Sequence, residues 1–172
     1  FHSLGRVSYS SALALQERLM QQAIQRKKSR RNAGLDGKDT SEDSDLAWPE
    51  NHLIFLEHDH VLTLGKTGSS GHLVASEQRL EELGVEFYLT NRGGDITYHG
   101  PGQLVGYPII DLEQFYTDIG KYMRMLEEAI IRTCADYGIE TGRTSGLTGV
   151  WVNPEAGLGA RKIAALGVKC SR

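Results

Sequence analysis

Residues 92 to 104 read RGGDITYHGPGQL, and this stretch limits the possible folds more than any other part of the chain. Four glycines and one proline make it unsuitable for a helix or a central strand, because glycine is conformationally free and proline lacks an N–H donor. Strand-like segments flank it, EFYLT at 86–90 and LVGYPII at 104–110. The sequence therefore predicts a glycine-rich loop held between strands of a rigid sheet.

The hydrophobic pattern outside this loop predicts an α+β fold. Residues 11–25 and 118–137 carry apolar residues at helical spacing, and a shorter helix is expected between Ser76 and Gly84. One face of the helix at 118–137 is expected to hold Tyr122, Leu126, Ala129, Ile130, Thr133 and Tyr137. Strands are expected at 52–58, 61–65, 86–90, 104–110, 149–152 and 162–170, the first two paired with each other. Because strands outnumber helices and several adjoin directly, we expect a mixed β-sheet with packed helices.

The length of 172 residues suits one domain, and residues 1–172 are expected to form a single domain. Within it, residues 26–50 are expected to be a mobile loop, because the part from 26 to 45 holds six basic, five acidic and only two apolar residues. The net charge of -3 does not indicate a nucleic-acid partner. No apolar run approaches the roughly 20 residues that span a bilayer.

The glycine-rich stretch could be a plain turn, since Gly-Pro-Gly alone marks one. However, four glycines exceed the need of one turn, and Arg92, Asp95, Tyr98 and His99 are interleaved with them. Missing side chains let a ligand approach the main-chain N–H groups. The phosphate-binding patterns GxxxxGK[ST] and GxGxxG before a helix are absent from it. We therefore expect the glycine-rich stretch to line a binding site for a ligand that is not a nucleotide held by one of these phosphate-binding loops.

The segment RGGDITYHGPGQLVGYP at 92–108 resembles the signature of the lipoyl(octanoyl) transferase family, also called lipoate-protein ligase B. The resemblance continues, in the family's order, in HLIFLEHDHVLTLGK, TDIGKYMRMLEEAI, TGVWV and ARKIAALGVKCSR. It implies a catalytic domain similar to those of biotin and lipoate ligases, here expected to lack its C-terminal part. The implied function is transfer of an octanoyl group to a lysine of a lipoyl domain, the first step of endogenous lipoate biosynthesis. No cofactor, metal or ATP is implied.

The resemblance also implies partners. Octanoyl-acyl carrier protein would be the donor, and the acceptors would be lipoyl domains of 2-oxoacid dehydrogenases and the glycine cleavage H protein. Such partners are usually acidic, so exposed cations are candidates for docking: Lys66, Lys121, Arg124 and Lys169. The block at 117–130 looks bacterial, which favours a bacterial cytoplasm, with an organelle as the alternative. Neither nucleic acid nor membrane is expected as a partner.

Family members hold the acyl group on a cysteine as a thioester, beside a lysine that favours the thiolate. Lys162 in RKIAALG matches this catalytic lysine, although a surface lysine is the alternative. Two segments that line the family's acyl pocket match the substrate-binding candidates Arg92, Gly93, Gly94, Asp95, Ile96, Thr97, Tyr98, His99, Ala165, Leu166 and Gly167. His99 could instead be structural, and for Asp95 a turn-stabilising hydrogen bond is favoured over a role as general base.

The chain departs from the family at the nucleophile. The family's cysteine lies a few dozen residues beyond the lysine motif, in a PCG-type segment, and the chain ends before it. Cys170 would lie about 26 Å from Lys162 along a strand, and Cys134 is expected near the apolar side of a helix, where a thiol is inert. Both are expected to be core residues. The intact protein is therefore expected to be the enzyme and this chain alone to be inactive.

Two other functions stay open: an ATP-dependent ligase of the lipoate or biotin type, and a degenerate copy that binds an acyl group or partner without turnover. The remaining polar residues are expected to be structural. His58 and His60 have a spacing that could hold a metal, but a solvated turn is favoured. Glu127 and Glu128 are expected on the solvated face of a helix. The two tryptophans, Trp48 and Trp151, are expected to pack against neighbours.

Overall fold

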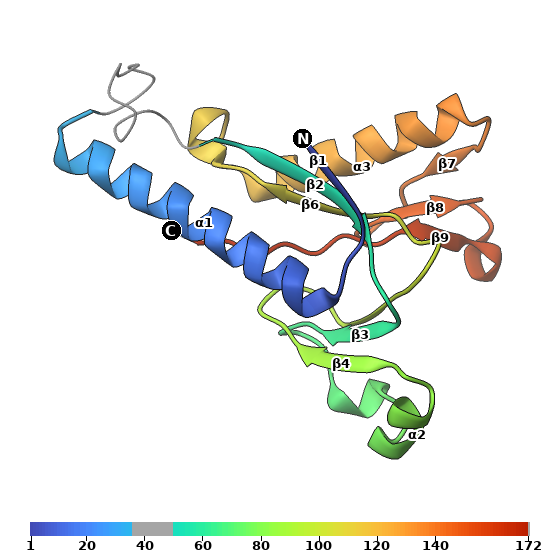
Figure 1. The fold of residues 1–172 in the computed structure, drawn as a ribbon. Helices are drawn as coiled ribbons and strands as arrows, with labels where there is room; N and C mark the ends of the chain where they lie inside the picture. The colour runs from blue at the N-terminus through green and yellow to red at the C-terminus, as the bar shows by residue number, and fades with distance from the viewer. Residues whose placement is uncertain (36–49, 172) are drawn as a thin grey trace. The chain divides into compact units, whose positions relative to one another are not determined.

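The computed structural model describes residues 1–35 and 50–171. Helices and strands are mixed along this part of the chain, which confirms the α+β fold (Figure 1). The chain divides into two compact units, the first made of Phe1–Thr90 and Asp95–Tyr116, the second of Asn91–Gly94 and Thr117–Arg172. A single domain over 1–172 stays a prediction. None of the described helices is long and apolar enough to cross a membrane.

The first unit contains a sheet of three strands in the order β1-β2-β6. These strands are β1 (His2–Arg6), β2 (His52–Glu57) and β6 (Val105–Ile109). β1 runs parallel to β2, and β2 runs antiparallel to β6. The sequence pattern missed β1, because all five of its residues are exposed and its apolar residues are too few to alternate.

Helix α1 (Tyr9–Asn32) covers this first sheet. It begins at Ser8, whose Oγ accepts the N–H of Ser11. The core of the packing is formed by the buried Ala12, Ile54, Leu56 and Val105, with Val7, Leu15, Leu19, Tyr107 and Ile109 partly buried around them. Full burial of one such Ile, Leu or Val side chain contributes about 1.5–3 kcal/mol. The apolar stripe of the predicted helix is thus the stripe that packs on the sheet.

α1 continues seven residues beyond its predicted end at residue 25. Residues 26–32 are therefore helical and do not belong to a loop. Their arginines and lysines are good helix formers, and Lys27 is bound to Asp111 and Glu113 across the unit. The rest of the predicted mobile segment, from 36 to 49 and including Trp48, lies outside the described residues.

A second sheet of the first unit has the order β4-β3-β5. Its strands are β4 (Glu86–Leu89), β3 (Val61–Leu64) and β5 (Ile96–His99). β3 is parallel to β4 and antiparallel to β5. Between β3 and β4 lies α2 (Glu77–Glu82), which is capped by Ser76 and followed by Gly84 at φ +63°, as predicted.

Two expectations about this region are wrong. β2 and β3 are strands, but each is the centre of its own sheet and they do not pair with each other. The glycine-rich stretch also contains a strand, β5, because ITYH is an uninterrupted run of β-branched, aromatic and imidazole side chains. Only the residues on either side of β5 form loops.

The second unit holds α3 (Ile119–Asp136), β7 (Thr141–Gly142), β8 (Val150–Val152) and β9 (Arg161–Ala164). The strands form an antiparallel sheet in the order β7-β8-β9, and α3 packs against β7 and β8. Asp118 caps α3 through the N–H of Lys121 at 2.9 Å. β9 ends at Ala164, six residues before the predicted end at Cys170.

The buried face of α3 differs from the predicted one. Ala129, Thr133 and Tyr137 were expected on the apolar face but are exposed. Glu127 was expected in solvent but is fully buried, whereas the side chain of Glu128 keeps 41% of its exposure. The helix is therefore rotated so that a carboxylate, and not an apolar side chain, occupies the centre of its packed face.

Candidate active site

Lys162 lies on β9 directly opposite Trp151 of β8. Its Nζ is 4.7 Å from the centroid of the Trp151 ring, a cation–π contact. The ring itself is buried, with 6% exposure, while Lys162 is exposed. Trp151 is thus the packing residue that was predicted, and it also holds the amine of Lys162 at a defined place beside the sheet.

Gly149 closes the other side of Lys162. Its φ of +130° is one that favours glycine. A Cβ atom at Gly149 would lie 2.6 Å from Ala164 O and 3.3 Å from both Lys162 Cε and Trp151 Cη2. Glycine at this position therefore lets the main chain approach the lysine stem more closely than any side chain would allow.

The structure brings two of the predicted substrate-binding segments together in the second unit. The N–H of Gly93 donates to Val168 O at 2.9 Å. A Cβ atom at Gly167 would lie 2.6 Å from Gly93 O, so the two main chains touch. Arg92 donates from Nη1 to Gly93 O at 3.0 Å. Residues 92–94 and 165–167 therefore form one surface of closely packed main chain, on which Ala165 is exposed and Leu166 half-buried.

Asp95 begins the part of the segment that belongs to the first unit. Its carboxylate accepts N–H groups of Ile96 and Ser69 and contacts His72 Nδ1. The hydrogen bond from Ile96 has the largest effect and lowers the pKa of Asp95. Desolvation opposes it, and the smaller effects of His72 and Ser69 add to the lowering, so the pKa lies below its ordinary value. These contacts are the turn-stabilising bonds predicted for Asp95.

The next four residues form β5. Ile96, Thr97 and His99 are half-buried, whereas Tyr98 is exposed. The hydroxyl of Tyr98 lies 2.5 Å from His60 Nδ1. His99 Nδ1 lies 2.7 Å from Gln103 Oε1, which can only accept, so this nitrogen of His99 carries the proton. The side chains of this segment are thus fixed by their neighbours on the strand and turn.

His58 is fully buried, so its prediction as part of a solvated turn is wrong. Its Nδ1 donates to Val7 O at 2.7 Å, and the hydroxyl of Tyr107 donates to its Nε2 at 2.8 Å. Its ring also meets the ring of His99 edge to face, with 5.8 Å between centroids. Because both ring nitrogens are engaged in hydrogen bonds, His58 acts as a structural histidine beneath β5.

The two cysteines and the docking candidate Arg124 differ from their predicted surroundings in part. Cys134 is half-buried on α3, but Cys170 is exposed. The core prediction for Cys170 is wrong because β9 ends at Ala164 and leaves the following residues outside the sheet. Among the docking candidates, Arg124 is bound to the buried Glu127 at 2.6 Å, which makes it a structural residue as well.

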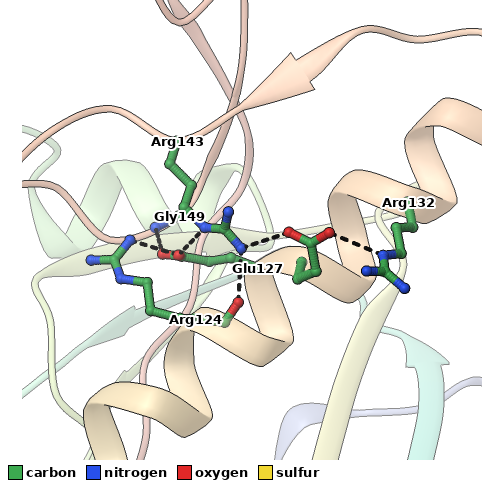
Figure 2. Close-up of polar contacts among 6 residues, drawn as sticks. Arg124, Glu127, Arg132, Arg143 and Gly149 are labelled. Atoms are coloured by element: carbon green, nitrogen blue, oxygen red, sulfur yellow. Dashed lines mark hydrogen bonds and ion pairs between the residues drawn. The ribbon is translucent and has the colours of Figure 1, made fainter.

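Glu127 and Gly149 were missed by sequence reasoning. The N–H of Gly149 donates to Glu127 Oε1 at 2.9 Å, which links the main chain beside Lys162 to α3 (Figure 2). A signal was present for Glu127, since it stands four residues after Met123 and three before Ile130, on the apolar stripe. No local pattern marks Gly149, because its conformation depends on a partner 22 residues away.

Comparison with known proteins identifies the family. Residues 8–172 match the model of the lipoyl protein ligase A/B catalytic domain. A curated octanoyltransferase of Cytophaga hutchinsonii is 53% identical over 169 residues, which cover 98% of this chain and 66% of the relative. The octanoyltransferase of Flavobacterium johnsoniae is 51% identical over 172 residues, covering 98% and 68%. The chain thus spans about two thirds of the length of these relatives.

Solved structures share the fold. A bi-partite lipoate protein ligase from Thermoplasma acidophilum is similar with a TM-score of 0.55 at 18% identity, over 98% of this chain and 56% of that one. P. falciparum LipL1 in complex with lipoate gives the same TM-score of 0.55 at 16% identity, over 89% and 40%. The resemblance of the motifs to octanoyltransferases is confirmed by the curated relatives. The chain therefore belongs to the octanoyltransferases within the lipoyl protein ligase A/B catalytic-domain family.

Proposed function

We propose that the protein transfers an octanoyl group from acyl carrier protein to a lysine of lipoyl domains, with Lys162 as a catalytic residue. The names of the relatives support the reaction. The observation that carries the role of Lys162 is its amine, held 4.7 Å from the centroid of the Trp151 ring and packed against the bare main chain of Gly149. A lysine with only a surface role needs neither a buried aromatic platform nor a glycine at its stem.

The chemistry consists of two acyl transfers. In the first, a cysteine thiolate attacks the thioester carbonyl of the octanoyl carrier protein, and the carrier's sulfur leaves and takes up a proton. In the second, the lysine amine of the lipoyl domain attacks the new thioester, an amide forms, and the cysteine leaves as thiolate while the amine loses a proton. A nearby ammonium group at Lys162 favours the thiolate and can exchange these protons.

The closely packed main chain is assigned to substrate binding. Gly93 and Gly167 let the two main chains pack closely. The N–H of Gly93 is used by Val168 O, so other main-chain N–H groups of the two segments are proposed to stabilise the oxyanion of each transfer. We assign the same role in binding to the whole of the two segments, Arg92, Gly93, Gly94, Asp95, Ile96, Thr97, Tyr98, His99, Ala165, Leu166 and Gly167. The apolar members suit an octanoyl chain.

Neither Cys134 nor Cys170 is proposed as the acyl carrier. Cys134 is half-buried on α3, and the main chain around it is used to end that helix, since Cys134 O accepts the N–H groups of Tyr137 and Ile139. Cys170 stands outside the sheet that holds Lys162. Incubation with octanoyl-acyl carrier protein followed by peptide mass spectrometry should show neither residue acylated. Stoichiometric acylation of either one contradicts this assignment.

The role of Lys162 is tested in the intact protein by Lys162→Met, with Arg161→Met as the matched control on the same strand. Because loss of a positioned acid–base group costs about 10²–10⁴ in rate, we expect Lys162→Met to lower octanoyl transfer at least about a hundredfold. Arg161→Met should stay within about twofold of the parent. Both variants should keep the circular dichroism spectrum of the parent. Near-parental transfer by a folded Lys162→Met variant rules out the proposal.

The partners follow from the reaction. Octanoyl-acyl carrier protein is proposed as donor, and the lipoyl domains of 2-oxoacid dehydrogenases and the glycine cleavage H protein as acceptors. One structural relative is described together with its own E2 lipoyl domain, which supports this class of acceptor. The curated relatives are bacterial proteins, and we propose a bacterial cytoplasm as the location.

A further inference from the structure

A buried carboxylate lies at the centre of the second unit. Glu127 is 0% exposed, and both of its oxygens are used (Figure 2). Oε2 accepts from Arg124 Nη1 at 2.6 Å and from Arg143 Nε at 3.0 Å. Oε1 accepts the N–H of Gly149 at 2.9 Å. Two guanidinium groups and one main-chain N–H therefore converge on a single side chain of α3.

The two arginines keep this carboxylate in one orientation. Arg143 also donates from Nη2 to Arg124 O at 2.9 Å and to Glu128 Oε2 at 3.0 Å, which binds it to the backbone and to a second carboxylate of α3. A buried ion pair adds little net stability to a fold, because removing its charges from water costs much of the energy gained by their attraction. The ion pair can instead fix the orientation of the carboxylate, since charge-assisted and multidentate hydrogen bonds hold the acceptor in one position.

Oε1, the oxygen of this carboxylate that neither arginine contacts, accepts the N–H of Gly149, and Gly149 lies against the stem of Lys162. The main chain of Gly149 approaches Ala164 O and Lys162 Cε so closely that a Cβ atom would stand 2.6 Å and 3.3 Å from them. The ladder between β8 and β9 is irregular between Val150 and Trp151, directly after Gly149. Gly149 itself lies outside β8. Its N–H donates to Glu127 Oε1 at 2.9 Å, and this hydrogen bond fixes its position relative to α3.

We propose that Glu127 is a positioning residue for Lys162. It holds the main chain of Gly149 through one hydrogen bond, and Gly149 in turn confines the stem of Lys162 against Trp151. This inference rests on the proposed function only for its catalytic consequence. The positioning itself can be measured without any octanoyl transfer. It requires only that Glu127 on α3 limits the conformations of the Lys162 side chain on β9.

The test is Glu127→Asp, with Glu140→Asp as the matched control in the same unit. Both keep the charge and remove one methylene, but Glu140 is exposed and follows α3, whereas the side chain of Glu127 reaches Gly149. The shorter side chain cannot satisfy both arginines and the N–H of Gly149, so Lys162 gains freedom. We expect its acetylation rate by an N-hydroxysuccinimide ester at fixed pH to rise at least about twofold relative to Lys66, as measured by peptide mass spectrometry. Glu140→Asp should leave this ratio unchanged.

The kinetic consequence is measured on the intact protein with the same substitutions. A reacting group displaced by about 1 Å costs up to about a hundredfold in rate, so we expect kcat for octanoyl transfer to fall about tenfold or more in Glu127→Asp. The KM for the carrier protein should stay within about twofold. A purely structural glutamate would change neither the labelling of Lys162 nor the balance between kcat and KM.

Arg143→Lys is the second variant, because Glu127→Asp could prevent folding. Arg143 is 35% exposed in its side chain, and lysine keeps the positive charge but cannot brace Glu127 and Arg124 together. The labelling of Lys162 should rise in the same direction. Unchanged labelling of Lys162 in a folded Glu127→Asp or Arg143→Lys variant overturns the inference, even if kcat falls. Increased labelling with unchanged kcat supports the positioning and instead removes the catalytic role of Lys162.

Discussion

Gly167 and Gly93 face each other across one main-chain contact, and only one of them must be glycine. A Cβ atom at Gly167 would lie 2.6 Å from Gly93 O, whereas one at Gly93 would find its nearest neighbour, Val168 O, at 3.7 Å. We therefore expect Gly167→Ala to lower the free energy of unfolding by about 1–3 kcal/mol, the usual cost of overpacking. Gly93→Ala should stay within about 0.5 kcal/mol of the parent. Chemical denaturation measures both, and equal effects contradict the contact.

The carboxylate of Asp95 makes stability depend on pH in the acid range. Its hydrogen bonds from Ile96 and Ser69 and its contact with His72 depress its pKa below the ordinary value of 3.8. A depressed pKa means that the stabilisation is complete above 3.8 and is lost as the pH falls through the lower, folded value. Between pH 5 and pH 2 the parent should therefore lose more stability than Asp95→Asn. The unfolding free energy of both proteins is measured at each pH by denaturant titration. If the two pH profiles run parallel, the prediction is wrong.

At the scale of elements, Lys27 ties the last turns of α1 to the short 3₁₀ helix at Leu112–Gln114 that follows β6. Its Nζ lies 2.8 Å from Asp111 Oδ1 and 3.0 Å from Glu113 Oε1, and the side chain of Asp111 is only 8% exposed. Lys27→Met leaves this carboxylate without its cation and should cost about 1–3 kcal/mol. Lys28→Met, on the exposed side of the same helix, should cost less than about 0.5 kcal/mol. Equal losses of stability in the two variants, measured by thermal unfolding, would disprove a stabilising role of the Lys27 ion pairs.

The same pair has a signature at high pH. Burial alone would lower the pKa of Lys27, but the hydrogen bonds and charges of Asp111 and Glu113 outweigh it and raise the pKa above 10.5. The stabilisation is therefore complete below pH 10.5 and is lost as the pH rises through the folded value. The difference in stability between the parent and Lys27→Met should shrink only above about pH 10.5.

The elements also show where local patterns were sufficient. The helices at 119–136 and 77–82 were predicted, together with the N-terminal cap Ser76 of the second. The cap Asp118 of the first was not predicted as a cap. Helical period and capping residues can be read from the sequence because they depend on residues close together in the chain. β5 was missed because glycines around ITYH hid a strand whose partner residues in β3 stand 32 or more residues earlier. β9 was predicted too long because its apolar pattern continues after Ala164, where the main chain instead binds Gly93.

For the whole molecule, the proteins that it resembles are named for two different reactions: a structural neighbour is a lipoate protein ligase, and the sequence relatives are octanoyltransferases. The fold therefore does not decide between the proposed octanoyl transfer and ligation. A thioester donor is already activated, so octanoyl transfer should proceed at the same rate with and without ATP. Lipoate-dependent exchange between ATP and pyrophosphate should be absent. The measurement is a transfer assay with carrier protein and lipoyl domain, with and without ATP. ATP-dependent exchange would support the ligase and contradict the transferase.

The residues by themselves determined the α+β class, most helices and strands, and the family, because these depend on hydrophobic period, caps and short motifs that neighbouring residues specify. The candidate lysine was found in the same way, from RKIAALG. Only the tertiary structure decided which strands pair, why Glu127 is buried, and what stands beside Lys162. The physical reason is that a buried charge is tolerated only where distant groups compensate it. Arg143 and Gly149, 16 and 22 residues away, supply that compensation, and no local pattern contains them.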